Sequence, residues 1–190
     1  MLLVSQNIEN YEVELPKNVI FRINMAWCNS IVELDTKLKK QPNSKFFIDL
    51  PIGRIKPPNN RYSLEEIVPI IESNNNVEFF AISNVESEND LIEFQNKLPI
   101  KVNLVPKIES PTAIKNLDNI CKSLKHSEKF LMLDHDDLFS SMIRNKEDPE
   151  NFSKYIEILV DYCNKNRINL LRTVGVVFSD DEKRLTQYQK

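Results

Sequence analysis

The chain has 190 residues, of which 41% are hydrophobic and 28% are charged, and its formal net charge is −3 at pH 7. This length allows one domain over residues 1–190 with a substantial core. Charges of both signs are scattered, which argues against a nucleic-acid surface, and no apolar run approaches the roughly 18 residues that a membrane helix needs. We therefore expect a small-molecule ligand, with neither nucleic acid nor membrane as a partner.

Cysteine and glycine usage narrow the class of protein further. Cys28, Cys121 and Cys163 are odd in number and lack CxxC spacing, which is typical of reduced thiols in a cytoplasmic protein. Gly53 and Gly175 are the two glycines of the sequence, so neither a Walker loop nor a dinucleotide-binding fingerprint can be present.

Short apolar strands alternate with longer amphipathic helices along the chain, which is the pattern of a parallel α/β sheet. Strands are predicted at residues 1–4 (a weak pattern), 18–24, 45–50, 77–83, 101–109, 129–133 and 169–177. Helices are predicted between them, at about residues 31–38, 63–73, 87–98, 110–120 and 151–166. Ser63 and Glu66 form a capping box, Ser87 is expected to cap the third helix, and Ser110 followed by Pro111 opens the fourth.

This order of elements predicts an α/β fold with a (β/α)8 TIM-type barrel, without a lid and without a C-terminal domain. A typical barrel of this kind has about 250 residues. The predicted barrel is therefore abbreviated, or a second copy of the chain completes it in a homo-oligomer. An open doubly wound sheet is the alternative fold.

The most informative segment is residues 104–112, where a strand gives way to a helix. Lys107 and Glu109 are two residues apart and therefore point to the same face of the sheet. The next strand is followed by three more carboxylates, those of Asp134, Asp136 and Asp137. Because the carboxyl ends of parallel strands meet at one edge, these side chains predict a hard-cation site there, with Lys107 beside it to hold an anionic substrate.

Structural roles remain open for each of these side chains. Glu109 and Asp137 could lie at helix N-termini simply because the helix dipole favours carboxylates there. Lys107 could form an ion pair with Glu109 and do no more. Arg22 projects from an apolar strand and needs a partner, and Asp49 could be that partner.

Five segments, in the right order over about residues 18–140, resemble the catalytic barrel of pyruvate kinase, within the wider superfamily of barrels that bind phosphoenolpyruvate or pyruvate. The segments are Phe21-Arg-Ile-Asn-Met25, Ile48-Asp-Leu-Pro-Ile-Gly-Arg-Ile-Lys56, Phe80-Ala-Ile-Ser-Asn-Val-Glu-Ser-Glu-Asn-Asp90, Val105-Pro-Lys-Ile-Glu-Ser110 and Asp136-Asp-Leu138. The resemblance implies a magnesium-dependent transferase that acts on phosphoenolpyruvate, pyruvate or a related 2-oxo acid through an enolate.

Position by position, the resemblance implies a role for each matching residue. Lys107 would stabilise the transferring phosphoryl group or the enolate oxygen, and Arg22 would hold the substrate phosphate or carboxylate. Glu109 and Asp137 would be the ligands of Mg²⁺ or Mn²⁺. Three more residues would belong to the substrate site: Asn24 and Asp49, which would line a K⁺ site, and Thr173, which remains from the threonine-rich motif of the family's seventh strand.

Departures from the family pattern keep other functions open. Ala26 and Trp27 stand where the family has a potassium-binding serine and a histidine, which argues against K⁺. The segment between Lys56 and Ser63 is too short for the lid domain that covers the nucleotide. The later segments also resemble class II aldolases and citrate-lyase-like carbon–carbon lyases of the same superfamily. A degenerate barrel without catalysis, kept as a binding or assembly module, is the third alternative.

Overall fold

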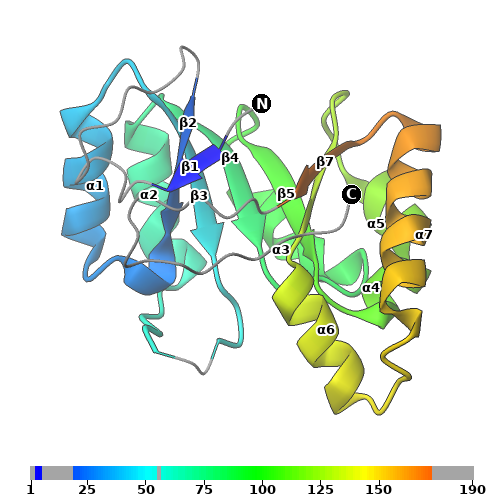
Figure 1. Ribbon diagram of the computed structural model, residues 1–190. Coiled ribbons are helices and arrows are strands. Elements are labelled where there is room, and N and C mark those ends of the chain that lie inside the picture. The colour runs from blue at the N-terminus through cyan, green and yellow to red at the C-terminus, as the bar shows by residue number, and fades with distance from the viewer. Residues whose placement is uncertain (1–2, 6–18, 55–56, 173–190) are drawn as a thin grey trace.

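Seven parallel strands form one sheet whose spatial order follows the sequence, from β1 to β7 (Figure 1). The computed structural model describes residues 3–5, 19–54 and 57–172. The strands are β1 (Leu3–Ser5), β2 (Ile20–Asn24), β3 (Lys45–Leu50), β4 (Val77–Ile82), β5 (Asn103–Ile108), β6 (Phe130–Leu133) and β7 (Asn169–Arg172). Every neighbouring pair is parallel, so all the carboxyl ends meet at one edge of the sheet.

Helices connect successive strands and begin at polar caps. They are η2 (Met25–Trp27), α1 (Ile31–Lys40), α2 (Leu64–Ser73), α3 (Asn89–Lys97), α4 (Pro111–Lys115), α5 (Leu117–Ser123), α6 (His135–Arg144) and α7 (Asn151–Asn166). The predicted capping box is present at α2, where Ser63 and Glu66 each accept the backbone N–H of the other. None of the helices in the described part of the chain combines the length and the apolar content needed to cross a membrane.

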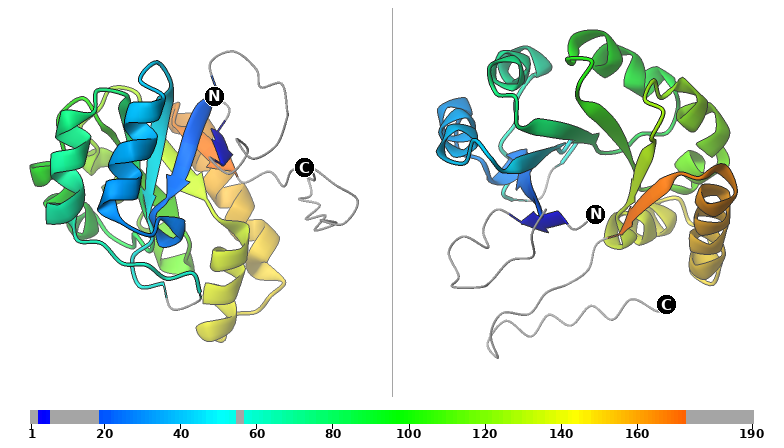
Figure 2. Two further views of the ribbon diagram at one scale, coloured as in Figure 1. Left: turned by 90° about the vertical axis from the view of Figure 1, so that its left-hand side faces the viewer. Right: turned by 90° about the horizontal axis from the view of Figure 1, so that it is seen from above.

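Alternation of side chains along the strands separates two apolar layers. One face of the sheet packs against the helices in a core that includes Ile23, Ile48 and Phe80. The concave face has its own buried cluster, made of Ile20, Phe47, Phe79, Ala81, Val105, Phe130 and Met132. Figure 2 shows the curved sheet with its helices on the convex side. Because both faces carry buried apolar side chains, the strands are apolar almost throughout.

The sheet is open, so the predicted (β/α)8 TIM-type barrel is wrong. Among the described residues, β1 pairs with β2 alone and β7 with β6 alone, and the two edges do not join (Figure 2). A closed barrel needs hydrogen-bonded strands around the full circle. The doubly wound alternative does not fit either, because the strand order never reverses and the helices lie on one face.

The predicted strands agree with β2 to β6 to within two residues at either end, and α7 matches its predicted range. The strand predicted at residues 1–4 is observed at Leu3–Ser5. For the last strand, the structure describes Asn169–Arg172, and residues 173–177 of the prediction lie outside the described residues.

Two helix predictions are wrong in part, and one helix was not predicted. The single helix predicted at residues 110–120 breaks at Asn116, whose side-chain amide donates to the Glu86 carbonyl. Ser87 does not cap α3, because the Asp90 carboxylate accepts the N–H groups of Glu86 and Ser87 instead. Finally, α6 begins where the sequence pattern had indicated only a run of acidic residues.

Candidate functional site

Lys107 and Glu109 lie together at the carboxyl end of β5. Val105 belongs to the concave cluster, so residues two and four positions further along the strand share that face. Lys107 Nζ lies 2.6 Å from Glu109 Oε1, and the two side chains are only 6% and 2% exposed. Solvent screens such a buried ion pair far less than it screens a surface pair.

Two further carboxylates come from the segment that follows β6. Asp134 is the N-cap of α6, and its side chain accepts the backbone N–H of Asp137 at 3.3 Å. This cap places Asp137 in the first helical turn. One carboxylate oxygen from each of Glu109, Asp134 and Asp137 then lies within 4.8 Å of the others. Lys107 Nζ is also 4.0 Å from Asp134 Oδ2.

A backbone N–H from the neighbouring strand end holds Glu109 in place. Asn84 follows β4 and Ser83, and its φ of 57° is in the left-handed region. Its N–H donates to Glu109 Oε2 at 2.8 Å, while its side-chain amide donates to the Ile52 carbonyl at 2.6 Å. Glu109 Oε1 is buried, and its contact is the Lys107 ammonium.

Electrostatics keep Lys107 charged despite its burial. Burial alone would lower the pKa of Lys107, but attraction by Asp49, Glu109 and Asp134 raises it above its ordinary value. Burial raises the pKa of Glu109, while the Lys107 ammonium and the Asn84 N–H oppose this effect. An ammonium with a raised pKa is a poor nucleophile at neutral pH, so the chemistry open to Lys107 is electrostatic.

Arg22 and Asp49 form a second buried ion pair on the concave face. Arg22 Nε donates to Asp49 Oδ2 at 3.1 Å, and Nη2 contacts the same oxygen. The Asp49 side chain is 0% exposed, whereas that of Arg22 is 22% exposed. Burial opposes ionisation, but Lys107 and Arg22 together hold the pKa of Asp49 below its usual value. Asp49 is therefore the partner of Arg22, which was one of the roles that the sequence allowed.

Asn24, another predicted substrate-site residue, has a structural role instead. Asn24 Oδ1 accepts the backbone N–H of Ala26 at 3.0 Å and thereby caps η2. The resemblance implies that Asn24 lines a K⁺ site, but this oxygen already accepts a backbone hydrogen bond. Thr173 lies outside the described residues.

The three carboxylates fit a hard divalent cation. Mg²⁺ takes oxygen ligands at about 2.1 Å, so oxygens around one ion lie up to about 4.2 Å apart. The oxygens of Glu109, Asp134 and Asp137 lie within 4.8 Å, and small side-chain rotations would bring them into this range.

Sequence reasoning placed Asp134 among the carboxylates of this edge but gave it no role of its own, and it missed the supporting residue Asn84. Asp134 and Asp137 have the spacing of an N-cap and its N3 residue, and Leu138 follows, so this signal could have found α6. The bond from Asn84 to Glu109 has no comparable signal, because it depends on β4 and β5 being neighbours.

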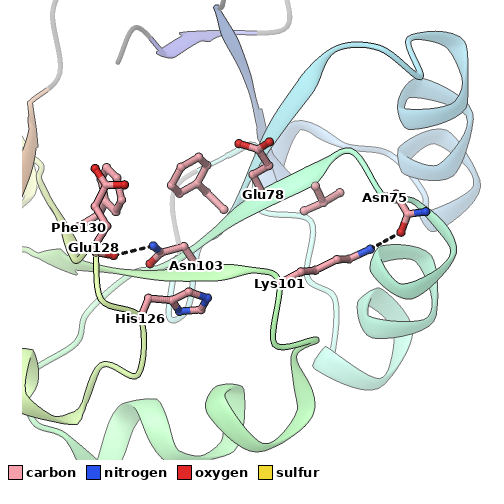
Figure 3. Close-up of a pocket in the computed structure, with 9 residues that line it drawn as sticks. Asn75, Glu78, Lys101, Asn103, His126, Glu128 and Phe130 are labelled. Carbon is pink, nitrogen blue, oxygen red and sulfur yellow. Dashed lines mark hydrogen bonds between the residues drawn. The ribbon is translucent and has the colours of Figure 1, made fainter.

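A separate pocket of about 330 Å³ opens at the amino ends of β4, β5 and β6, opposite the acidic cluster (Figure 3). Its polar side chains have protein partners. Lys101 Nζ donates to Asn75 Oδ1 at 2.8 Å, and Asn103 donates to the Glu128 carbonyl at 2.8 Å. The amino ends of parallel strands seldom carry chemistry, so the acidic cluster remains the candidate site.

Comparison with known proteins gives information on the fold alone. The sequence matches no protein-family model and no curated protein. Among solved structures, the chain is similar to RipC from Yersinia pestis, with a TM-score of 0.57 and 13% sequence identity. The match covers 85% of this chain and 72% of that chain. At this identity, the similarity concerns the arrangement of the elements and carries no statement about function.

Proposed function

We propose that this chain is a divalent-cation-dependent enzyme that acts on phosphoenolpyruvate, pyruvate or a related 2-oxo acid through an enolate. The observation that carries the proposal is the convergence of Glu109, Asp134 and Asp137 around the buried Lys107. The resemblance of the same strand ends to pyruvate kinase points to the same chemistry. Three free cysteines agree with a cytoplasmic location, which is part of the proposal.

The charges suit an enolate better than a neutral substrate. Negative charge grows on the oxygen at C2 when a 2-oxo acid loses a proton or a carbon–carbon bond next to its carbonyl. A bound Mg²⁺ or Mn²⁺ would act there as a Lewis acid. Lys107 supplies a second, fixed positive charge in a water-poor site, where it stabilises a developing oxyanion most strongly.

Titration calorimetry with MgCl₂ and oxalate, an enolate mimic, tests this proposal. The wild type should bind oxalate much more tightly when Mg²⁺ is present, and Glu109→Gln should abolish this Mg²⁺-dependent gain, because the cation loses a ligand. Glu93→Gln is the matched control, since Glu93 is an exposed partner of Lys97 on α3 and should leave binding unchanged. Absence of any heat with the wild type would reject the proposal.

A carbon–carbon lyase of the class II aldolase type is the second candidate reaction. The chain passes from β3 to α2 through residues 51–63, which leaves no room for a nucleotide-covering lid domain. Release of pyruvate from 4-hydroxy-2-oxo acids, followed by a coupled assay, distinguishes this reaction from phosphoryl transfer to ADP. If the protein binds oxalate but catalyses neither pyruvate release nor phosphoryl transfer, the result would favour a non-catalytic binding module.

A further inference from the structure

Lys107 is the counter-ion of the acidic cluster formed by Glu109, Asp134 and Asp137. Its Nζ lies 2.6 Å from Glu109 Oε1 and 4.0 Å from Asp134 Oδ2. Both carboxylates belong to the group of three that fits a divalent cation. Lys107 and the cation are therefore directed at the same negative charges.

The two oxygens of Glu109 differ in how freely they can turn. Its Oε2 accepts the N–H of Asn84 at 2.8 Å, and the Asn84 side chain is itself tied to the Ile52 carbonyl. Turning Oε2 toward a cation would leave that N–H without its acceptor, which is unfavourable in a buried site. Oε1 is thus the oxygen that can turn toward a cation without loss of a backbone hydrogen bond, and there the cation competes with the Lys107 ammonium.

Once a cation takes Glu109 and Asp134, the acid that still attracts Lys107 is Asp49. Asp49 is fully buried and shares its charge with Arg22. The Ser83 hydroxyl, 3.5 Å from Lys107 Nζ, is neutral. Two buried cations that share one carboxylate are incompletely neutralised, which is costly, so an anion from solution would bind next to Lys107.

We propose that cation binding at the cluster releases Lys107 from Glu109 and thereby turns this lysine into the receptor for the carboxylate or enolate oxygen of a 2-oxo acid. This inference rests on the proposed function and adds an order of binding, with the cation before the substrate. Because coupling between two ligands is reciprocal, the anion also tightens cation binding by the same factor.

Calorimetric titration with Mn²⁺ in the absence of any anion tests the competition. Lys107→Met should bind Mn²⁺ roughly tenfold more tightly than the wild type, because the competing ammonium is gone. When loaded with Mn²⁺, Lys107→Met should bind oxalate roughly 10- to 100-fold more weakly than the Mn²⁺-loaded wild type does. Lys115→Met is the matched control, since Lys115 is an exposed lysine 3.8 Å from Glu147 and should change neither affinity.

Glu109→Gln provides a second test that needs no metal. The amide cannot neutralise Lys107, so the metal-free variant should bind oxalate roughly tenfold more tightly than the metal-free wild type. This result decides the inference even if Lys107→Met fails to fold, and unchanged oxalate affinity overturns it. If the wild type binds Mn²⁺ but Lys107→Met binds it no more tightly, the inference fails while the proposed function stands. A wild type that binds no Mn²⁺ refutes the proposed function itself.

Discussion

Glu109 is held by contacts on both of its carboxylate oxygens. The backbone N–H of Asn84 holds one oxygen, and the Lys107 ammonium faces the other. A glutamate side chain has three rotatable bonds, so it serves as a reliable ligand only where neighbouring groups restrict it. Asn84 is therefore a positioning residue, and its left-handed backbone is what directs the N–H at Glu109.

Substitution of Asn84 tests this role. Asn84→Ala disfavours the left-handed conformation, so the N–H should turn away and cation affinity should fall roughly 10- to 100-fold, as is common when support of a ligand is lost. Asn84→Gly keeps the left-handed conformation and the N–H, and should stay close to wild type. Calorimetry with Mn²⁺ measures both, with urea unfolding alongside to follow stability.

Lys146 offers a matched control for backbone strain. Its φ is also 57°, but it lies in an exposed turn after α6. Lys146→Ala should lower stability to a similar extent without affecting Mn²⁺ binding. Equal Mn²⁺ affinities for Asn84→Ala and the wild type would show that Asn84 does not position Glu109.

At the scale of elements, α5 and α7 carry two buried thiols. Cys121 and Cys163 belong to the core between the sheet and its helices, with 3% and 2% exposure. Burial raises the pKa of Cys121 to about 11 and raises that of Cys163 as well. Both thiols are therefore neutral and unreactive at physiological pH.

The raised pKa of Cys121 predicts a loss of stability in alkaline solution. The unfolded thiol ionises near pH 8.5, to a first approximation. The folded thiol ionises at about 11, so the unfolded state loses its proton first as the pH rises. The contribution of Cys121 to the free energy of unfolding is thus complete below about pH 8.5 and declines from there as the pH rises toward the folded pKa.

Urea unfolding on both sides of this window measures the effect. Cys121→Val removes the titrating thiol. The urea concentration at the midpoint of unfolding should therefore fall less between about pH 7.5 and about pH 10 than it does in the wild type. Ile120→Val, a buried neighbour on α5 without a titrating group, should keep the wild-type fall. Parallel pH profiles for Cys121→Val and the wild type would contradict the prediction.

At the scale of the whole molecule, the open sheet should be most stable at its centre. β3 pairs with β2 and β4, and β4 also pairs with β5, whereas β1 has three residues and one neighbour. Local opening is easiest where few contacts must break. We expect backbone amides in β3 to β5 to exchange hydrogen roughly 100-fold more slowly than those in β1. Exchange followed by NMR or mass spectrometry measures this, and uniform rates across the sheet would be inconsistent with it.

The periodicity of the sequence was enough to place most strands and helices. Runs such as Phe46-Phe47-Ile48 predict buried parallel strands, and the Ser63 capping box sets the start of α2, because these signals depend on local chemistry. The closure of the sheet could not be predicted in this way. Closure depends on the twist and stagger accumulated over all strands, and an αβ-alternating pattern is shared by open and closed sheets.

The sequence alone determined that Lys107 and Glu109 face the same side of one strand end, because side chains two residues apart in a strand always do. It also placed Asp134, Asp136 and Asp137 at the same edge. Only the tertiary structure decided that Asp134 and Asp137 are the two that lie with Glu109, that Asn84 donates to one oxygen of Glu109, and that Arg22 is already paired with Asp49. These contacts join residues 25 or more positions apart along the chain, and their geometry follows from which strands are neighbours in the folded sheet.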